Sequence, residues 1–348
     1  MLVMPHPSKS SRESATCRLL RAGLLRTSMP GAQGHGRRLL AAPPWPYFTP
    51  EQAIHSQAAW EELPIAGRGC DGAAAPQSRH TSVPAVVHQP WLHGGALRWE
   101  HILGMLSVRY VLKPTRYRLY FDRTPTTSPT WRCACLIAHC VQHSAPTRVP
   151  GRPGQRLKMY HWPDVMRLQL LLRHGGIFVD HDAFVVKPLD DLRQCAAAPV
   201  IAGFEQVSAI ETERKLNPGV LLAAPNATML RLMLASWGHN YSTAWDWNCC
   251  SRSYAVHQAN PGLAQVRADL GPLPRFRTKQ EYQAHLRRAR VVHATALSHR
   301  WRRQELRASG VLRAVRDIVL AAANTSVGES AELKACAARV SAYMDHTF

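Results

Sequence analysis

The segment from Tyr160 to Arg193 constrains the fold of this chain more than any other. Pro163 suits the first position of a helix, and the apolar residues after it recur at helical spacing. Gly175-Gly176 ends the predicted helix, and Ile177–Val179 follows as a short buried strand. The apolar helix positions are Val165, Met166, Leu168, Leu171 and Leu172. A helix followed at once by a buried strand predicts a helix that packs on an α/β sheet.

Two carboxylates, Asp180 and Asp182, directly follow this strand and flank His181. Side chains alternate along a strand, so we expect both carboxylates on one side of the backbone. Ligands of open α/β sheets collect at the carboxyl ends of strands, and Mg²⁺ or Mn²⁺ prefers carboxylate oxygens. The pattern therefore predicts a site for a divalent cation and the diphosphate that it neutralises. A capping role or a calcium site is the alternative.

Asp164 and Arg167 lie three residues apart at the start of the predicted helix and so share one face. As a surface ion pair they would contribute little to stability. Because they lie close in sequence to the Asp pair, we expect them to bind the donor sugar of a transferase. Gly175 and Gly176 are expected to shape this donor site through a left-handed turn and close backbone approach.

Further short strands alternate with helices, which predicts a mixed, mostly parallel sheet with helices on both faces, an α/β fold. Arg148–Gln155 is predicted as a Pro/Gly loop. We divide the chain into a disordered or linker-like region over 1–80, one α/β domain over 81–301 and a helical extension over 302–348. The expected strands are Val83–His88, Arg116–Phe121, Val200–Phe204 and Val220–Ala224, and the expected helices include Leu97–Val108 and Ala227–Trp237.

The formal net charge of +20 comes mostly from scattered arginines. Nucleic-acid-binding proteins concentrate such charge on one face, so we expect no nucleic-acid partner. The nine cysteines predict no disulfide framework, and the Cys133–Cys140 cluster matches no common zinc spacing. No apolar run of about 20 residues is present, so no transmembrane helix is expected. Three sequons, at Asn226, Asn240 and Asn324, permit glycosylation in a secretory lumen.

Residues 160–193 resemble the sugar-binding region of glycosyltransferases that contain a DXD motif. The relatives include the α-1,6-mannosyltransferase that initiates outer chains and the α-1,4-galactosyl- and α-1,4-N-acetylglucosaminyltransferases. Softer likeness extends to Val83–His88 and to Asn217–Val220, so that the resemblance covers about 83–301. It implies a GT-A fold, a UDP- or GDP-sugar donor, a glycan or glycolipid acceptor, Mn²⁺ or Mg²⁺, retention of anomeric configuration and a Golgi or secretory location with membrane association.

By the same resemblance, Asp180 and Asp182 hold the cation and the diphosphate, and a late histidine completes the ligand set. His293 follows two valines and is preferred over His299 for that role; an ordinary, partly buried histidine is the alternative. Glu205 and Asn217 are candidates on the acceptor side, and no catalytic nucleophile is assigned.

The chain departs from the family at three points. Pro163 stands where a serine is usual, His181 stands between the two Asp where a small residue is usual, and the membrane anchor of Golgi relatives is missing. Two functions thus remain: a retaining, metal-dependent glycosyltransferase, or a catalytically inactive protein of the same fold that binds a nucleotide, a glycan or a protein partner.

Overall fold

The computed structural model describes residues 82–125, 128–194, 196, 198–205, 215–271, 279–294, 300–326 and 328–347. The region 1–80, predicted to be disordered or linker-like, lies outside these residues. The described residues all belong to one compact unit, Pro46–Phe348.

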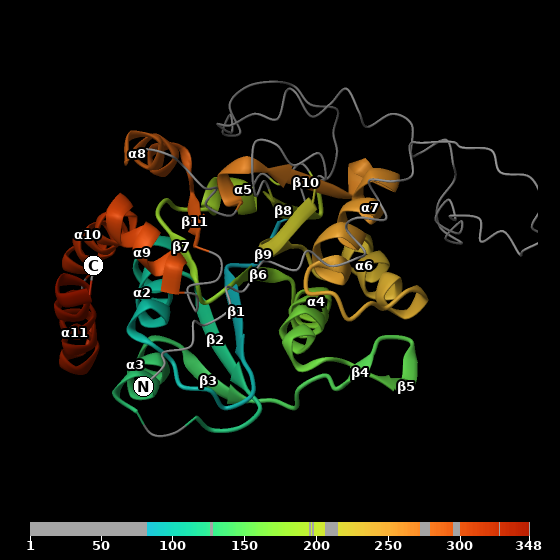
Figure 1. Ribbon diagram of the computed structural model, residues 1–348, viewed down its shortest axis with the longest axis horizontal. Coiled ribbons are helices and arrows are strands. Elements are labelled where there is room, and N and C mark those ends of the chain that lie inside the picture. The colour runs from blue at the N-terminus through green and yellow to red at the C-terminus, as the bar shows by residue number, and fades with distance from the viewer. Residues whose placement is uncertain are drawn as a thin grey trace, which may run out of the picture. The chain divides into compact units, whose positions relative to one another are not determined.

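A seven-stranded sheet forms the centre of this unit, in the order β10-β8-β9-β6-β1-β2-β3. Four neighbouring pairs are parallel, and β9 is antiparallel to both β8 and β6. The expected mixed, mostly parallel sheet is therefore confirmed (Figure 1). The strands are β1 (Val86–Trp91), β2 (Arg116–Phe121), β3 (His139–Gln142), β6 (Gly176–Val179), β8 (Val200–Glu205), β9 (Lys215–Ala223) and β10 (Ala264–Arg267).

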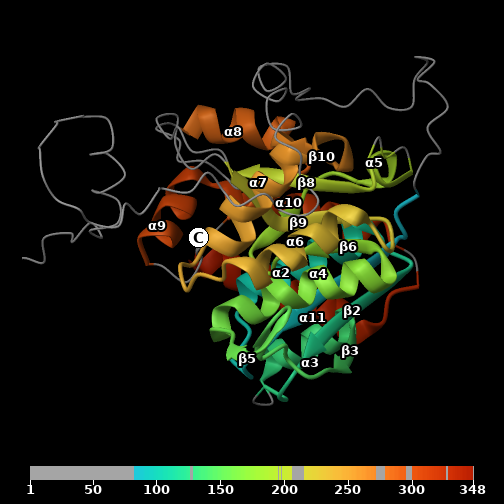
Figure 2. The same ribbon diagram turned by 90° about the vertical axis from the view of Figure 1, so that its right-hand side faces the viewer.

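Helices cover both faces of the sheet because its central strands are apolar on both sides. In β6, Ile177 and Val179 join a core with one group of helices, whereas Phe178 between them joins a core on the opposite face. The first group comprises α2 (Trp99–Ser107), α3 (Pro129–Ile137), α10 (Val311–Asn324) and α11 (Ala331–Thr347). The second group comprises α4 (Trp162–His174), α6 (Thr228–His239) and α7 (Arg252–Ala259), and Figure 2 shows α4 and α6 side by side.

Two small sheets and several short helices complete the described part of the chain. Strands β7 (Ala183–Val185) and β11 (Val291–His293) pair antiparallel, directly after the Asp pair in the case of β7. Strands β4 (Arg148–Val149) and β5 (Arg152–Arg156) form a hairpin, so the loop predicted over Arg148–Gln155 is wrong. The remaining elements are η3 (Val108–Leu112), η4 (Met159–His161), α5 (Asp190–Gln194), η5 (Trp247–Ser251), η6 (Pro261–Leu263), η7 (Ala268–Leu270), α8 (Lys279–Arg288) and α9 (Arg300–Ser309).

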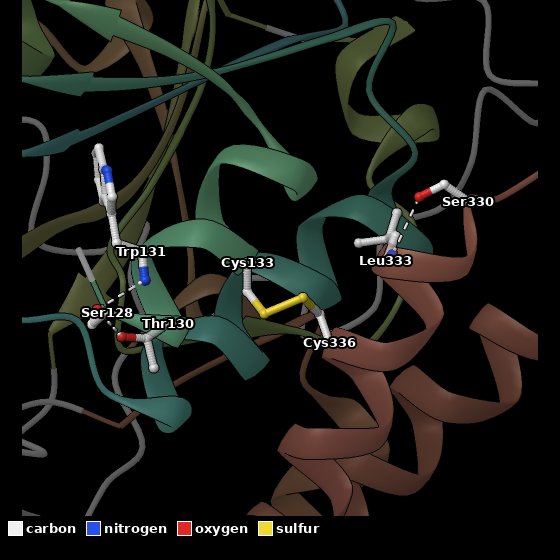
Figure 3. The surroundings of a disulfide bond; sticks show 7 residues. All are labelled: Ser128, Thr130, Trp131, Cys133, Ser330, Leu333 and Cys336. Atoms are coloured by element: carbon white, nitrogen blue, oxygen red, sulfur yellow. Dashed lines mark hydrogen bonds between the residues drawn. A yellow bond between two sulfur atoms is a disulfide. The ribbon is translucent and has the colours of Figure 1, made fainter.

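A disulfide joins Cys133 of α3 to Cys336 of α11, which are 203 residues apart in sequence (Figure 3). Both helices begin with a serine cap next to this bond: Ser128 Oγ accepts from the amide of Trp131, and Ser330 Oγ accepts from the amide of Leu333. A second disulfide joins Cys135 to Cys140. The structure thus corrects the expectation that no disulfide framework exists.

None of the helices in the described part of the chain has the length and apolar composition needed to span a bilayer.

Candidate metal and sugar site

The two carboxylates of the Asp pair lie at the carboxyl end of β6, in the middle of the sheet. The strand ends at Val179, and a tight turn follows in which the amide of Ala183 donates to the carbonyl of Asp180 over 3.0 Å. The amide of Asp180 donates to Gly219 O over 2.7 Å. The turn, rather than strand alternation as expected, therefore brings the two side chains together.

A buried amide fixes this strand end from the other side. Gln89 in β1 is fully buried, and its Nε2 donates to Val179 O over 2.7 Å. Its Oε1 accepts from the hydroxyl of Tyr117 in β2. Because the three strands are joined beneath the turn, the carboxylates stand on a rigid base.

His293 reaches the Asp pair from a distant part of the sequence. It is the last residue of β11, which pairs with β7 so that His293 lies opposite Ala183. Its Nε2 lies 3.1 Å from Asp182 Oδ1 and 3.7 Å from Asp180 Oδ2. Ligand atoms of Asp180, Asp182 and His293 all lie within 4.8 Å of one another. His299, the other candidate, lies outside the described residues.

Asn217 sets the orientation of this imidazole. Its Oδ1 accepts from the amide of Gly219 over 2.9 Å and lies 3.0 Å from Nδ1 of His293. An amide oxygen only accepts, so Nδ1 carries a proton and Nε2 is directed at the carboxylates. A second partner of this kind is typical of histidines that bind metals. The structure therefore places Asn217, expected on the acceptor side, behind His293.

The Asp164–Arg167 pair lies beside the Asp pair and is almost fully buried. Arg167 Nη2 lies 2.7 Å from Asp164 Oδ1 and 3.4 Å from Asp180 Oδ1, and Nη1 donates to Pro218 O over 2.7 Å. Its guanidinium also stacks over the ring of Phe178, 4.3 Å from the centroid. Arg167 thus links the start of α4 to the end of β6.

Burial and charge set the ionisation of these carboxyls. Burial raises the pKa of Asp164 to about 7, although Arg167 opposes the rise. Burial also raises the pKa of Asp180, against the positive charge of Arg167. At Asp182 burial acts in the same direction, but the charge of His293 and its hydrogen bond outweigh it and lower the pKa to about 2. The cluster therefore combines an ionised carboxylate with neighbours that a nearby cation would help to ionise.

These residues line a cleft of about 860 Å³. One wall carries Trp91, whose ring lies 4.9 Å from the rings of both His101 and His181. The rim on another side carries Tyr160 and Trp245, whose ring centroids are 5.4 Å apart. The sequence analysis missed all these aromatic walls. Only Trp91 had a sequence signal, because it stands at the end of the first strand.

The other predicted site residues lie elsewhere. Gly175 and Gly176 are at the opposite end of β6 with φ of 62° and 107°, close to Pro225 and to the backbone of β1, and they do not line the cleft. Glu205 is the last residue of β8, where its backbone pairs with Lys215. The roles assigned to these three residues remain predictions.

Residues 151–197 match the family model described as the glycosyltransferase sugar-binding region containing DXD motif. This span includes α4, β6 and the Asp pair, so the resemblance seen in the sequence is confirmed for this region. The chain is also similar to glucan organizing enzyme 1 of Cryptococcus neoformans var. grubii, with 26% identity over 207 residues, 56% of this chain and 55% of that protein. The aligned part thus spans about half the length of this relative.

Two solved structures are similar at the level of the chain trace. The apo form of the glycosyltransferase GlyE of Streptococcus pneumoniae has a TM-score of 0.44 and 12% identity, over 70% of this chain and 64% of that one. Glucosyl-3-phosphoglycerate synthase of Mycobacterium tuberculosis, solved with Mn²⁺, UDP and phosphoglyceric acid, has a TM-score of 0.34 and 17% identity, over 62% of this chain and 78% of that one.

Proposed function

We propose that this chain, which carries the sugar-binding region of the DXD-containing glycosyltransferases, transfers a hexose from a nucleotide-sugar donor to a hydroxyl of a glycan or glycolipid. The observation that carries the proposal is the convergence of Asp180, Asp182 and His293 within 4.8 Å at the floor of the cleft, beside the Asp164–Arg167 pair. Transfer from such a donor requires a cation for the diphosphate and a polar group for the sugar, and this arrangement supplies both.

The donor atoms of the cluster fit a divalent cation such as Mn²⁺ or Mg²⁺. Two carboxylates and one imidazole combine hard oxygen ligands with a nitrogen ligand, a set that Mn²⁺ accepts more readily than Ca²⁺. Asp180, Asp182 and His293 would hold the ion, with Asn217 fixing the imidazole. A bound cation would neutralise the charge that grows on the diphosphate as the glycosidic bond breaks.

The Asp164–Arg167 pair is suited to hold the donor sugar. Arg167 is fixed by Pro218 O and stacks on Phe178, so that it holds Asp164 in one geometry. Asp164 would accept hydrogen bonds from sugar hydroxyls at the cleft surface. Groups fixed in this way orient a bound substrate at little entropic cost.

We propose that transfer retains the anomeric configuration, as the family resemblance implies. The acceptor oxygen bonds to the anomeric carbon as the bond to the diphosphate oxygen breaks, and the hydroxyl proton passes to the leaving diphosphate. This route requires no protein nucleophile. Proton NMR of the product's anomeric coupling compared with that of the donor would test it, and an inverted coupling constant would contradict it.

We also propose that the chain works in the secretory pathway, as the resemblance to Golgi enzymes implies. The two disulfides support this, because such bonds persist in oxidising compartments. The asparagines of all three sequons, Asn226, Asn240 and Asn324, are exposed. A mobility shift on endoglycosidase treatment of the secreted protein is expected, and a cytosolic protein with reduced cysteines would contradict this location.

The function is tested with a panel of UDP- and GDP-sugars in Mn²⁺, read out as released nucleotide. We expect one donor to be hydrolysed slowly in the absence of acceptor, and Mn²⁺ with UDP or GDP to raise the midpoint of thermal unfolding. Asp182→Ala should abolish both effects, whereas Asp317→Ala, at a carboxylate that is 61% exposed, should abolish neither. Stabilisation without hydrolysis of any donor would instead indicate the inactive binding protein.

A further inference from the structure

Large apolar side chains gather at one rim of the cleft. Five are well exposed in the described part of the chain, and four of them, Met159, Tyr160, Trp245 and Trp247, come from two short segments around η4 and η5. Trp245 is 69% exposed, an unusual state for the largest apolar side chain. Single exposed apolar residues need no explanation, but a group beside a cleft marks a surface that binds something.

Tyr160 and Trp245 form the part of this group that faces the cleft. Both line it, and their rings are 5.4 Å apart and tilted by 39°. The hydroxyl of Tyr160 donates to the carbonyl of Thr243, which ties the two segments together. We call this pair of rings the aromatic platform.

The platform stands on a rigid base. The buried ring of His161 lies edge-on to Tyr160, with centroids 4.4 Å apart. Its nitrogens are hydrogen-bonded to Tyr241 Oη at 3.0 Å and to Ala244 O at 3.2 Å. Because this histidine holds the backbone on both sides of Trp245, the platform is positioned before any ligand binds, which lowers the entropic cost of binding.

The location of the platform separates it from the expected nucleotide position. In an open α/β sheet a ligand binds beyond the carboxyl ends of the parallel strands, here β1 and β2, which lead to the wall at Trp91. The platform instead comes from the segments before α4 and after α6, on the opposite side of the Asp pair in sheet order. A ligand there would approach the reaction centre from the side away from the nucleotide.

Polar groups next to the platform fit a carbohydrate. Asp246 also lines the cleft, and its Oδ2 lies 2.6 Å from Lys215 Nζ, so that its carboxylate remains ionised and fixed beside the rings. A pyranose has one face of C–H groups and a rim of hydroxyls. The negative face of an aromatic ring attracts the C–H face, and a neighbouring carboxylate accepts from the hydroxyls.

We propose that Tyr160 and Trp245 form an acceptor subsite that stacks on a pyranose ring of the acceptor glycan, with Asp246 bound to its hydroxyls. This inference rests on the proposed function, because it assigns the acceptor side of the same cleft. It implies that the acceptor is a glycan, or the sugar portion of a glycolipid, rather than a protein side chain.

Saturation-transfer NMR tests the platform directly. The probes are the methyl α- and β-glycosides of mannose, galactose, glucose and N-acetylglucosamine, each with the full chain, Mg²⁺ and UDP or GDP. We expect saturation of the ring protons of at least one probe, a loss of at least fivefold in Trp245→Ala, and substantial retention in Trp245→Phe. The matched control is Trp247→Ala, which removes a tryptophan that is 39% exposed but does not line the cleft.

Each outcome decides one question. Equal saturation in wild type and Trp245→Ala, or no saturation by any probe, overturns the acceptor subsite. If Trp245→Ala instead removes the thermal stabilisation given by Mn²⁺ and nucleotide, the ring stacks on the base and the inference is wrong. Should the wild-type protein show neither that stabilisation nor donor hydrolysis, the proposed function fails, while glycoside binding still decides whether the platform binds sugars.

Discussion

Replacing Asp164 by asparagine should stabilise the metal-free protein more at pH 8 than at pH 5. The cause is burial, which raises the pKa of the Asp164 carboxyl from 3.8 to about 7 even though Arg167 lies 2.7 Å away. At neutral pH the folded protein therefore holds a carboxylate whose charge is only partly compensated. Asparagine has a similar shape and carries no charge.

The magnitude follows from proton linkage. Between pH 3.8 and about 7 the folded chain binds more protons at Asp164 than the unfolded chain does, so the free energy of unfolding falls as the pH rises through this window. Each pH unit costs about 1.36 kcal/mol. From pH 5 to the folded pKa this amounts to about 2.7 kcal/mol, and above that pKa the loss stops growing.

Urea unfolding at pH 5 and pH 8, with EDTA present, measures the effect as a double difference. Wild type and Asp164→Asn share all other titrating groups, so the change of their stability difference between the two pH values isolates this carboxyl. We expect the variant to gain about 2.7 kcal/mol relative to wild type. Asp190→Asn removes the exposed member of another i,i+3 pair, with Arg193, and controls for the loss of an ion pair.

A double difference of zero would refute the reasoning, because Asp164 would then be ionised at both pH values and its pairing with Arg167 would outweigh burial. A positive result has a functional meaning. The protein would hold an energetically costly carboxylate at its candidate sugar site, and stability would have been exchanged for binding.

Three further predictions concern the scaffold. Gly175→Ala should lower the stability by more than about 2 kcal/mol in urea unfolding, since φ is +62° and a Cβ would lie 2.6 Å from a proline ring, whereas Gly262→Ala, with open space around it, should change it little. Cys336→Ser should cost about 5 kcal/mol and Cys140→Ser about 2, in proportion to the logarithm of loops of 203 and 5 residues; equal losses would contradict the loop-entropy argument. Burial lowers the pKa of His88 to about 4, so the unfolded chain binds more protons between pH 6.5 and 4, and the part of the acid destabilisation due to this group should disappear in His88→Gln.

Local patterns explain how much of the fold could be predicted from the sequence. Strand β2 has the predicted bounds, Arg116–Phe121, because its residues alternate in polarity. The helix and strand before the Asp pair were also predicted, since a proline begins the one and a Gly-Gly step separates the two. The β4–β5 hairpin was missed, because Arg152–Arg156 is mostly exposed and contains Pro and Gly, so that no buried face marks it as a strand.

The site divides in the same way. Asp180, Asp182, Asp164 and Arg167 lie within one local motif and could be found by spacing. His293 is 111 residues from Asp182, and only its place at a strand end suggested it. No local signal marks Trp245 or the position of Asn217 behind His293, because both depend on how loops from separate strands and helices meet above the sheet.

The long disulfide has a consequence for how the chain must be made. Cys133 leaves the ribosome 203 residues before Cys336, and every side chain of the candidate metal cluster is synthesised between them. During this interval Cys133, Cys135 and Cys140 lie within eight residues of one another without the native partner of the first. The growing chain can therefore pair them wrongly, and correct maturation should depend on a thiol–disulfide isomerase that keeps Cys133 available until α11 arrives.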